Sequence, residues 1–340
     1  MPELTICMPS HRNLAGSRLA IESALAYCRA RDALLVVSDN SGDPEKRAWL
    51  ESIGAPLIYL AQDNDDARLN IEAAIAAAPT LLVMPMGDDD QILIDPAQPA
   101  FDLSDLPFDY VGVTPVTISF SEALGMERHK AFEITADEAG GRMIGYLEQA
   151  HGDNGSFHSI YRRDVFASVL KLYAEAHPTK GNYGDWAILL ALAAYGKFAH
   201  DPSTVYRYNM AKWDSAEKIS ALTEAAYTSV GLPPHPETYE KLLQFLDIFI
   251  FATRGGTPLS QDERQRLSKD IVNIFLGSFV QQIAENPENY DGAMRHLASM
   301  VLEERDSFTQ FQIALMMVDR IQPGLKDRYV AFVKHAFQGM

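Results

Sequence analysis

The first part of the chain alternates short apolar runs with longer segments of helical spacing. The runs are rich in Leu, Val and Ile, and the segments between them carry Pro, Asp or Ala at the places expected of helices. This β-α-β-α-β-α-β order predicts a parallel, doubly wound sheet with helices on both faces. The expected strands are residues 4–8, 34–37, 57–60 and 81–86, and the expected helices are residues 14–29, 44–53 and 65–78.

After Asp90 the regular alternation ends. Strands are expected at residues 110–119, 157–162, 197–200 and 204–208, and helices at 135–149, 164–175 and 185–195. From residue 214 onward the pattern is helical, with breaks that carry Gly and Pro. The helices expected there are residues 214–230, 236–253, 260–284, 290–305, 307–321 and 324–337. We therefore expect a first domain, residues 1–213, and an all-helical accessory domain, residues 214–340.

Charge and cysteine content exclude several classes of protein. The formal net charge of −17 argues against a nucleic-acid groove, because phosphate backbones need basic surface. Cys7 and Cys28 fall in an expected strand and an expected helix, so buried free thiols are expected rather than disulfides or a zinc site. No run approaches the length of a membrane span and no signal peptide is apparent. A cytoplasmic protein is the expectation, with the inner face of the membrane as an alternative.

Three consecutive aspartates, Asp88, Asp89 and Asp90, follow the apolar run at residues 81–86. A buried strand that ends in carboxylates gathers negative charges, which repel one another unless a cation or hydrogen-bond donors compensate them. Mg²⁺ often binds through one or two carboxylates plus substrate phosphates. The aspartates therefore predict a metal–diphosphate site, and a solvated turn is the alternative.

Two other polar loops follow expected strands in the same way. Residues 9–13, Pro-Ser-His-Arg-Asn, follow the first strand, and residues 38–43, Ser-Asp-Asn-Ser-Gly-Asp, follow the second. Parallel strands present their carboxyl ends at one edge of a sheet, and ligands bind at that edge, so these loops and the aspartates can converge on one crevice. The second loop could also be a simple turn with a helix cap.

With these motifs in this order, the sequence resembles the family 2 glycosyltransferases of the GT-A fold. That family commonly has a Pro-Thr/Ser-Tyr-Asn-Arg stretch and then an Asp-Asp-Gly-Ser-x-Asp loop, similar to residues 9–13 and 39–43. Further matches are an Arg-x-Asn at residues 68–70, the Asp-x-Asp motif at 88–90, an acidic residue before an aromatic at 185–186, and a Tyr-Arg strand at 206–208. The resemblance covers about residues 3–213.

The resemblance implies a fold and a nucleotide pocket. The fold is the GT-A, or nucleotide-diphospho-sugar transferase, fold, an α/β fold with a Rossmann-like and mostly parallel sheet. Asp39 would accept a hydrogen bond from the base, most often the imide N–H of uracil or thymine. The residues implied to surround the nucleotide are Pro9, Ser10, Arg12, Asp39, Ser41, Arg68, Asp88 and Asp89.

The resemblance also implies a metal ligand and a catalytic base. Asp90 would bind Mn²⁺ or Mg²⁺ and bridge it to the diphosphate, with Asp88 near the ribose and the metal, while Asp89 could be only a spacer. The cation would stabilise the charge of the leaving diphosphate. Asp185 would be the general base for the acceptor hydroxyl, kept ionised by its place at a helix start. An ordinary N-cap is the alternative for Asp185.

Some positions depart from the family pattern or allow two interpretations. Arg12 and Asn13 stand in the order opposite to the common one. Asn209 stands where the family often has a His that completes the metal site, which leaves the metal held by Asp90 and the diphosphate, or ligated elsewhere. Arg68 could bind near the nucleotide or only brace the sheet. For His158 a structural or solvent-facing role is favoured over one at the edge of the sugar pocket.

The chain is therefore predicted to be a metal-dependent, inverting glycosyltransferase of the hexosyltransferase type. It would move a sugar from a nucleotide-diphosphate sugar to a glycan or lipid-linked acceptor in polysaccharide or glycoconjugate synthesis. One alternative is a sugar-phosphate nucleotidyltransferase, disfavoured because residues 9–16 hold one Gly and one Arg instead of a Gly-rich basic loop. Another is a degenerate protein that binds a sugar nucleotide without catalysis. Peripheral membrane association and a homodimer through the helical domain stay open, and no nucleic-acid partner is expected.

Overall fold

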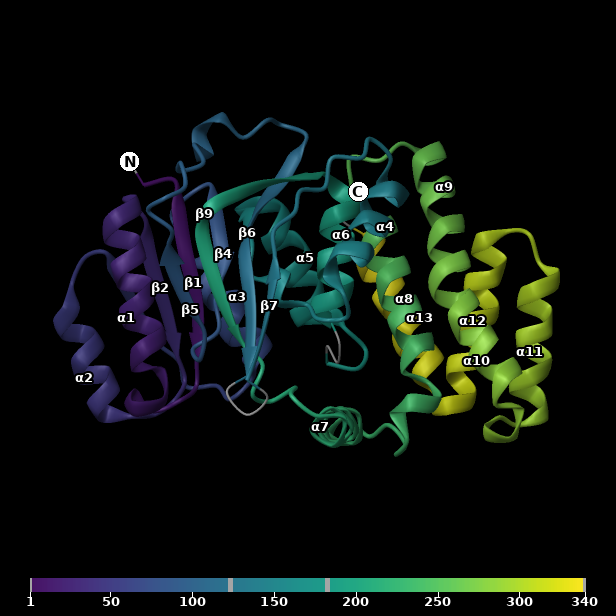
Figure 1. The fold of residues 1–340 in the computed structure, drawn as a ribbon. Helices are drawn as coiled ribbons and strands as arrows, with labels where there is room; N and C mark the ends of the chain where they lie inside the picture. Colours follow the sequence, from purple (N-terminus) through teal and green to yellow (C-terminus); the bar gives the residue numbers. More distant parts are fainter. Residues whose placement is uncertain (1, 122–124, 181–183, 339–340) are drawn as a thin grey trace. The chain divides into compact units, whose positions relative to one another are not determined.

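The computed structural model describes residues 2–121, 125–180 and 184–338 (Figure 1). This part of the chain forms two compact units. The first, which we call the sheet unit, spans Met1–Ala136, Gly145–Lys171 and Gly196–Asp214. The second, the helical unit, spans Asp137–Ile144, Leu172–Tyr195 and Ser215–Met340.

The sheet unit begins with four parallel strands joined by helices, in the spatial order β3-β2-β1-β4. These elements confirm the alternation expected from the sequence, with ends that differ by a few residues. In chain order they are β1 (Leu4–Ser10), α1 (Leu14–Arg31), β2 (Leu34–Asp39), α2 (Pro44–Ile53), β3 (Leu57–Ala61), α3 (Ala67–Ala76) and β4 (Leu82–Pro85).

Local chemistry explains where these helices start and which face they cover. The side chains of Asn13, Asp43 and Asp66 accept backbone N–H groups in the first turns of α1, α2 and α3, as N-caps do. The connections through α1 and α2 step outward to β2 and β3, whereas α3 returns past β1 to β4. Because such crossovers are right-handed, α3 lies on the face of the sheet opposite to α1 and α2, packed against β1 and β2 (Figure 1).

The other half of the sheet is mixed, which corrects the expectation of a mostly parallel sheet. β4 is followed across the sheet by β8 (Ile160–Arg162), β6 (Tyr110–Ser121), β9 (Lys197–Asn209) and β5 (Gln91–Ile94), and β7 (Met126–Lys130) pairs with β6. Only the β6–β9 pairing in this half is parallel, among the residues that the structure describes. β7 follows β6 directly along the chain, and strands with short connections pair antiparallel.

Three further differences concern which strands form and where they begin and end. β5 and β7 were not expected from the sequence. β9 is one strand where two short ones were expected, and its pairing with β6 shifts in register between Pro115 and Val116. The strand expected at residues 157–162 begins only at Ile160, because a 3-10 turn occupies Gly155–Phe157.

The helical unit contains the helices expected in the tail. One expected helix, residues 260–284, is divided into α9 (Gln261–Ile271), a π-helical turn (Val272–Leu276) and α10 (Gly277–Glu285). The remaining tail helices are α7 (Ala216–Ser229), α8 (Glu240–Thr253), α11 (Gly292–Glu303), α12 (Ser307–Ile321) and α13 (Leu325–Phe337).

The compact units differ from the expected division at residue 213 in two segments. Residues 137–144 and 172–195 belong to the helical unit, although the sequence placed them in the first domain. The second segment contains α6 (Gly184–Tyr195), whose residues from Ala187 to Ala194 are all buried. A helix that is apolar all round must be covered on every side, and α6 packs against α8. α4 (Ala139–Ala150) and α5 (Arg163–Ala176) divide between the units.

The structure also bears on membrane-spanning segments and on the two cysteines. None of the described helices combines the length and apolar character needed to cross a bilayer. Cys7 and Cys28 are buried free thiols, as expected. Burial raises the pKa of the Cys28 thiol to about 12, so this thiol stays protonated at neutral pH.

The centre of the mixed half leaves no room for a side chain at Gly112 of β6. A Cβ atom there would lie 2.3 Å from the backbone oxygen of Ile160 in the neighbouring β8. We expect Gly112→Ala to lower the free energy of unfolding by about 1–3 kcal/mol, because the backbone of β8 must move. Urea unfolding followed by circular dichroism measures this change.

The matched control is Gly145→Ala in α4, where a Cβ atom meets nothing within 4 Å. Alanine is the better helix former, so this variant should gain about 0.5–1 kcal/mol. Equal stabilities for the two variants would contradict the close approach of β6 and β8.

Candidate functional site

The polar loops that follow β1, β2 and β4 lie at one edge of the sheet unit. β1 is flanked by β2 and β4, and the pairing places Ser10 beside Asp39 and Cys7 beside Pro85. The strand order reverses direction between β1 and β4, and ligands of such sheets bind at the carboxyl ends of strands at this switch point. The structure therefore brings together the predicted residues of all three loops.

Asp88 holds the loop after β1 against the loop after β4. Its Oδ2 atom accepts hydrogen bonds from the Ser10 hydroxyl at 2.9 Å and from the backbone N–H groups of His11 and Arg12, each at 3.0 Å. Its Oδ1 atom lies 3.1 Å from Nε of Arg12. Because charge-assisted hydrogen bonds are strong and directional, the buried Asp88 carboxylate fixes the backbone conformation of the loop after β1.

Asp89 is more than a spacer. Its carboxylate forms an ion pair with the Arg12 guanidinium, and the Lys212 ammonium lies 4.0 Å away. Arg12 therefore lies between two neighbouring aspartates, with about a quarter of its side chain exposed. A guanidinium held in this way keeps its fork of donors at the rim of the site, where it can contact a phosphate.

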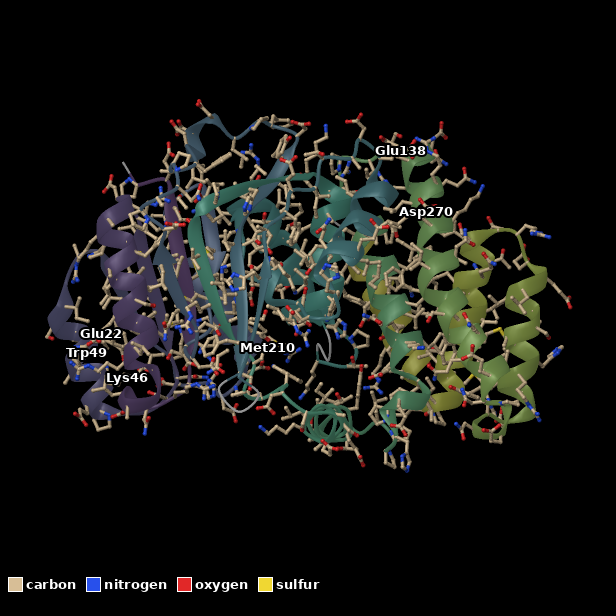
Figure 2. All side chains as sticks on the ribbon, in the orientation of Figure 1. Glu22, Lys46, Trp49, Glu138, Met210 and Asp270 are labelled. Carbon is tan, nitrogen blue, oxygen red and sulfur yellow. The ribbon has the colours of Figure 1, made fainter. Side chains whose placement is uncertain are left out.

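Lys46 ties the first two loops together and was not identified from the sequence. This residue of α2 has no solvent-exposed side-chain surface, and α2 lies on the α1 side of the sheet (Figure 2). Its ammonium donates to the Ser10 hydroxyl at 2.7 Å, to the Arg12 carbonyl at 2.8 Å and to Oδ1 of Asp39 at 2.8 Å. The sequence contained one indication of this role. A lysine in the first turn of a helix opposes the helix dipole, so its presence there indicates a stabilising interaction with another group.

Asp39 keeps acceptor capacity on one oxygen. Oδ1 is engaged by Lys46 and by the Ser41 backbone N–H at 3.1 Å. Oδ2 has a long contact of 3.4 Å with the Tyr59 hydroxyl. A carboxylate offers about four lone-pair positions, so Oδ2 can accept a further N–H donor.

Asp90 is held by β9 and not by the loop after β1. Oδ2 accepts a hydrogen bond from the Tyr206 hydroxyl at 2.6 Å, and Oδ1 accepts from the Asn209 backbone N–H at 2.8 Å. Burial raises the pKa of the Asp90 carboxyl, and burial together with Asp90 raises the pKa of Tyr206 well above its ordinary value. A Cβ atom at Gly87 would lie 2.5 Å from Oδ2 of Asp90, so a side chain at this position would displace the Asp90 carboxylate.

The other predicted residues are placed as follows. Pro9 is half-buried in β1 and Ser41 lies half-buried after β2. Arg68 pairs with Asp66, the N-cap of α3, and this hydrogen bond lowers the pKa of the Asp66 carboxyl. Asp185 is the one predicted site residue that belongs to the helical unit, where it lies half-buried in the first turn of α6.

The carboxylates at this edge offer few ligands to a divalent cation. Among the described residues, no group of three or more His, Cys, Asp or Glu side chains is arranged to hold a metal ion. Asp88 and Asp90 are engaged by different elements, although each Asp90 oxygen accepts one hydrogen bond and retains lone-pair capacity. A cation at this edge would therefore take one aspartate from the triplet and need ligands from the substrate as well.

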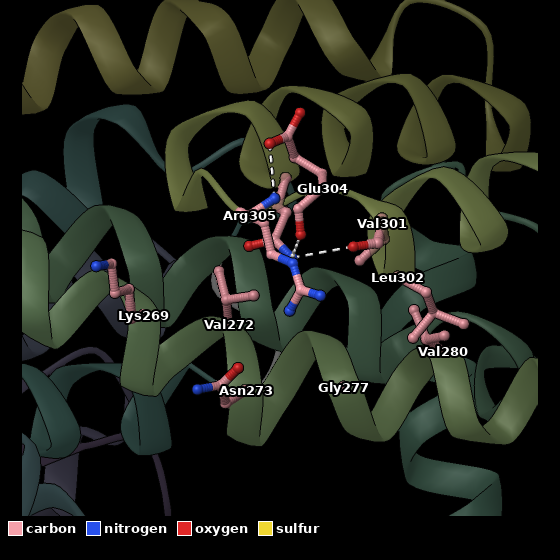
Figure 3. Close-up of a pocket in the computed structure, with 10 residues that line it drawn as sticks. Lys269, Val272, Asn273, Gly277, Val280, Val301, Leu302, Glu304 and Arg305 are labelled. Carbon is pink, nitrogen blue, oxygen red and sulfur yellow. Dashed lines mark hydrogen bonds between the residues drawn. The ribbon is translucent and has the colours of Figure 1, made fainter.

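The helical unit has a pocket of its own (Figure 3). It has a volume of about 290 Å³ and lies beside the π-helical turn and the end of α11. Its lining combines apolar side chains such as Val280 and Val301 with Lys269 and Arg305. None of the residues predicted from the sequence to bind nucleotide or metal lines it.

Comparisons with known proteins give little further information. No protein-family model matches the chain, and no curated protein matches it. The crystal structure of S. aureus TarS, residues 1–349, is 11% identical with a TM-score of 0.43, over 94% of this chain and 91% of that one. The same protein in complex with UDP is 13% identical with a TM-score of 0.40, over the same shares of the two chains. These values are too low to establish a shared fold or function.

The contribution of the buried Lys46–Asp39 ion pair to stability can be measured by substitution. Lys46→Met should lower the free energy of unfolding by about 3 kcal/mol or more, because Asp39 would keep a buried charge without its partner. The double variant Lys46→Met/Asp39→Asn should recover part of this loss. Urea unfolding of the wild type, Lys46→Met, Asp39→Asn and the double variant gives the coupling energy between the two side chains.

Arg47→Met provides the control, since Arg47 is the exposed neighbour on α2 and pairs only at the surface with Glu51. It should change stability little. Additive losses in the double variant would show that Lys46 and Asp39 do not form the pair described.

Proposed function

We propose that the protein is a glycosyltransferase of the GT-A type, which transfers a sugar from a nucleotide-diphosphate sugar to an acceptor hydroxyl with inversion. One observation carries this proposal. Ser10, Arg12, Asp39 and the three aspartates lie together at the carboxyl ends of β1, β2 and β4, held by Lys46 and Asp88. Sheets of this class bind nucleotides at such an edge.

The nucleotide would bind along the ends of β1 and β2. Oδ2 of Asp39 has capacity for the imide N–H of a pyrimidine base. Arg12 and Lys212, both partly exposed beside Asp89, would contact the diphosphate. A protein with a net charge of −17 needs such local cations to accept an anionic donor.

Mn²⁺ or Mg²⁺ would be held by Asp90 together with the diphosphate oxygens. When bound, the ion supplies Lewis-acid stabilisation of the negative charge on the leaving diphosphate. Asp88 would act through the loop that it fixes, because its Oδ2 already accepts three hydrogen bonds from the protein. Asp89 would position Arg12.

Asp185 is proposed as the general base. Its carboxylate would take the proton of the acceptor hydroxyl while that oxygen attacks the anomeric carbon, and the bond from this carbon to the diphosphate oxygen would break with its electron pair. A single displacement of this kind inverts the anomeric centre. The acceptor would be a glycan or a lipid-linked sugar.

Thermal shift with nucleoside diphosphates tests the donor class. UDP with Mn²⁺ should raise the melting temperature more than UDP alone, since a ligand that binds the folded state stabilises it by mass action. Release of pyrophosphate from a nucleoside triphosphate and a sugar phosphate would instead favour nucleotidyl transfer. No shift with any nucleoside diphosphate would contradict the proposal.

Asp90→Asn should abolish sugar transfer and remove the Mn²⁺-dependent part of the UDP shift. The variant should remain folded, because it loses a buried negative charge while keeping an acceptor oxygen and the size of the side chain. Asp102→Asn is the control, since this exposed aspartate only caps a 3-10 turn. Transfer at the wild-type rate by Asp90→Asn would exclude Asp90 from the site.

Asp185→Asn should lower kcat about 100-fold or more, the usual contribution of a general base. Binding of UDP should be unchanged, because Asp185 is not expected to touch the nucleotide. Steady-state kinetics and calorimetry with UDP separate the two effects. An equal loss of UDP binding would assign Asp185 to the donor pocket instead.

A further inference from the structure

His158 lies beside Asp90 in a fixed orientation. Its ring stacks on Tyr206 with the ring centroids 4.6 Å apart and the planes 14° from parallel. Its Nδ1 atom lies 3.0 Å from the Pro85 carbonyl oxygen, at the end of β4. Its Nε2 atom lies 3.8 Å from Oδ2 of Asp90. The chain thus supplies an imidazole next to the aspartate triplet from a segment far along the sequence.

The contact with Pro85 decides which ring nitrogen carries a proton. A carbonyl oxygen can only accept, so Nδ1 must be the donor. In the neutral ring, Nε2 then presents a lone pair toward a carboxylate oxygen that is also an acceptor. Two acceptors that face each other at this distance repel unless a cation or a proton lies between them.

The same geometry is typical of histidines that bind metals. A ligating imidazole usually donates its other N–H to a backbone carbonyl or a carboxylate, which fixes both the tautomer and the ring orientation. Ligands at about 2.1 Å from one octahedral ion are about 3.0 Å apart when adjacent and about 4.2 Å apart when opposite. The separation of 3.8 Å between Nε2 and Oδ2 falls between these two values, so a side-chain movement of about 1 Å or less would bring the two atoms to the spacing of adjacent ligands.

Asp90 has the capacity to share such an ion. Each of its oxygens accepts one hydrogen bond, from Tyr206 and from the Asn209 backbone. A carboxylate has about four lone-pair positions, so Oδ2 retains one for a cation. Ligating carboxylates are commonly hydrogen-bonded in this way by a second layer of groups, and Tyr206 serves both ligands by bonding Asp90 and stacking on His158.

We propose that His158 and Asp90 together are the protein ligands of a divalent transition-metal ion whose remaining ligands are diphosphate oxygens and water. This inference rests on the proposed function and adds the residue that the position near Asn209 does not provide. With two protein ligands, the ion binds weakly alone and firmly with the nucleotide. A nitrogen donor also favours Mn²⁺ over Mg²⁺, which prefers oxygen ligands.

Pulsed electron paramagnetic resonance of Mn²⁺ tests this assignment without an activity assay. In the wild-type protein with Mn²⁺ and UDP, electron spin echo modulation should show a directly bound imidazole nitrogen. His158→Gln and His158→Phe should both lose this signal, and Mn²⁺ affinity in the presence of UDP should fall at least about tenfold. The Phe variant keeps a ring to stack on Tyr206, so its loss of signal reports ligation and not packing.

His11→Gln is the matched control, because His11 also lies 3.8 Å from an aspartate of the triplet, Asp88, yet is largely exposed. It should leave the nitrogen signal in place. A signal that persists in both His158 variants, or a wild-type complex of Mn²⁺ and UDP without any nitrogen signal, would overturn the assignment. Absence of Mn²⁺-dependent UDP binding in every protein would instead overturn the proposed function, and the His158 assignment with it.

Discussion

The candidate site depends on one buried charge, the ammonium of Lys46. A lysine without solvent contact is tolerated only if every donor finds a partner and the charge is balanced. Its partners are Asp39 on β2, the Ser10 hydroxyl at the end of β1 and the Arg12 carbonyl in the following loop. These three groups must therefore keep their positions together, so the loops at this edge of the sheet are fixed before any ligand arrives.

The three consecutive aspartates show how neighbouring residues of one type acquire different tasks. Asp88 fixes a backbone loop, Asp89 holds a guanidinium, and Asp90 turns toward β9 and its tyrosine. Gly87 leaves the space that the Asp90 carboxylate occupies, since a Cβ atom there would lie 2.5 Å from Oδ2 of Asp90. Asp88 and Asp89 share the Arg12 guanidinium, whereas Asp90 binds hydrogen-bond donors of β9, and these partners offset part of the repulsion expected from the sequence alone.

Local sequence patterns predicted the first half of the sheet and the loops at its edge, since apolar runs, helix spacing and N-caps act over a few residues. The partners of the site residues could not be predicted. Asp90 meets Tyr206, and Asp88 meets Ser10, across long stretches of chain, and only strand order brings them together. β5 was missed because its four residues carry too short a pattern. The place of α6 in the helical unit was not foreseen, because an apolar helix gives no sign of which neighbours cover it.

The position of Arg12 between Asp88 and Asp89 affects how easily an anionic ligand can approach this edge of the sheet. Its charge is already balanced by carboxylates, and the whole protein is strongly anionic, so a bare diphosphate approaches against the field. A diphosphate that already carries its divalent cation has lost most of this penalty. Under the proposed function, the donor would therefore enter most easily as its complex with the divalent cation, and the Arg12 guanidinium would exchange one anionic partner for another.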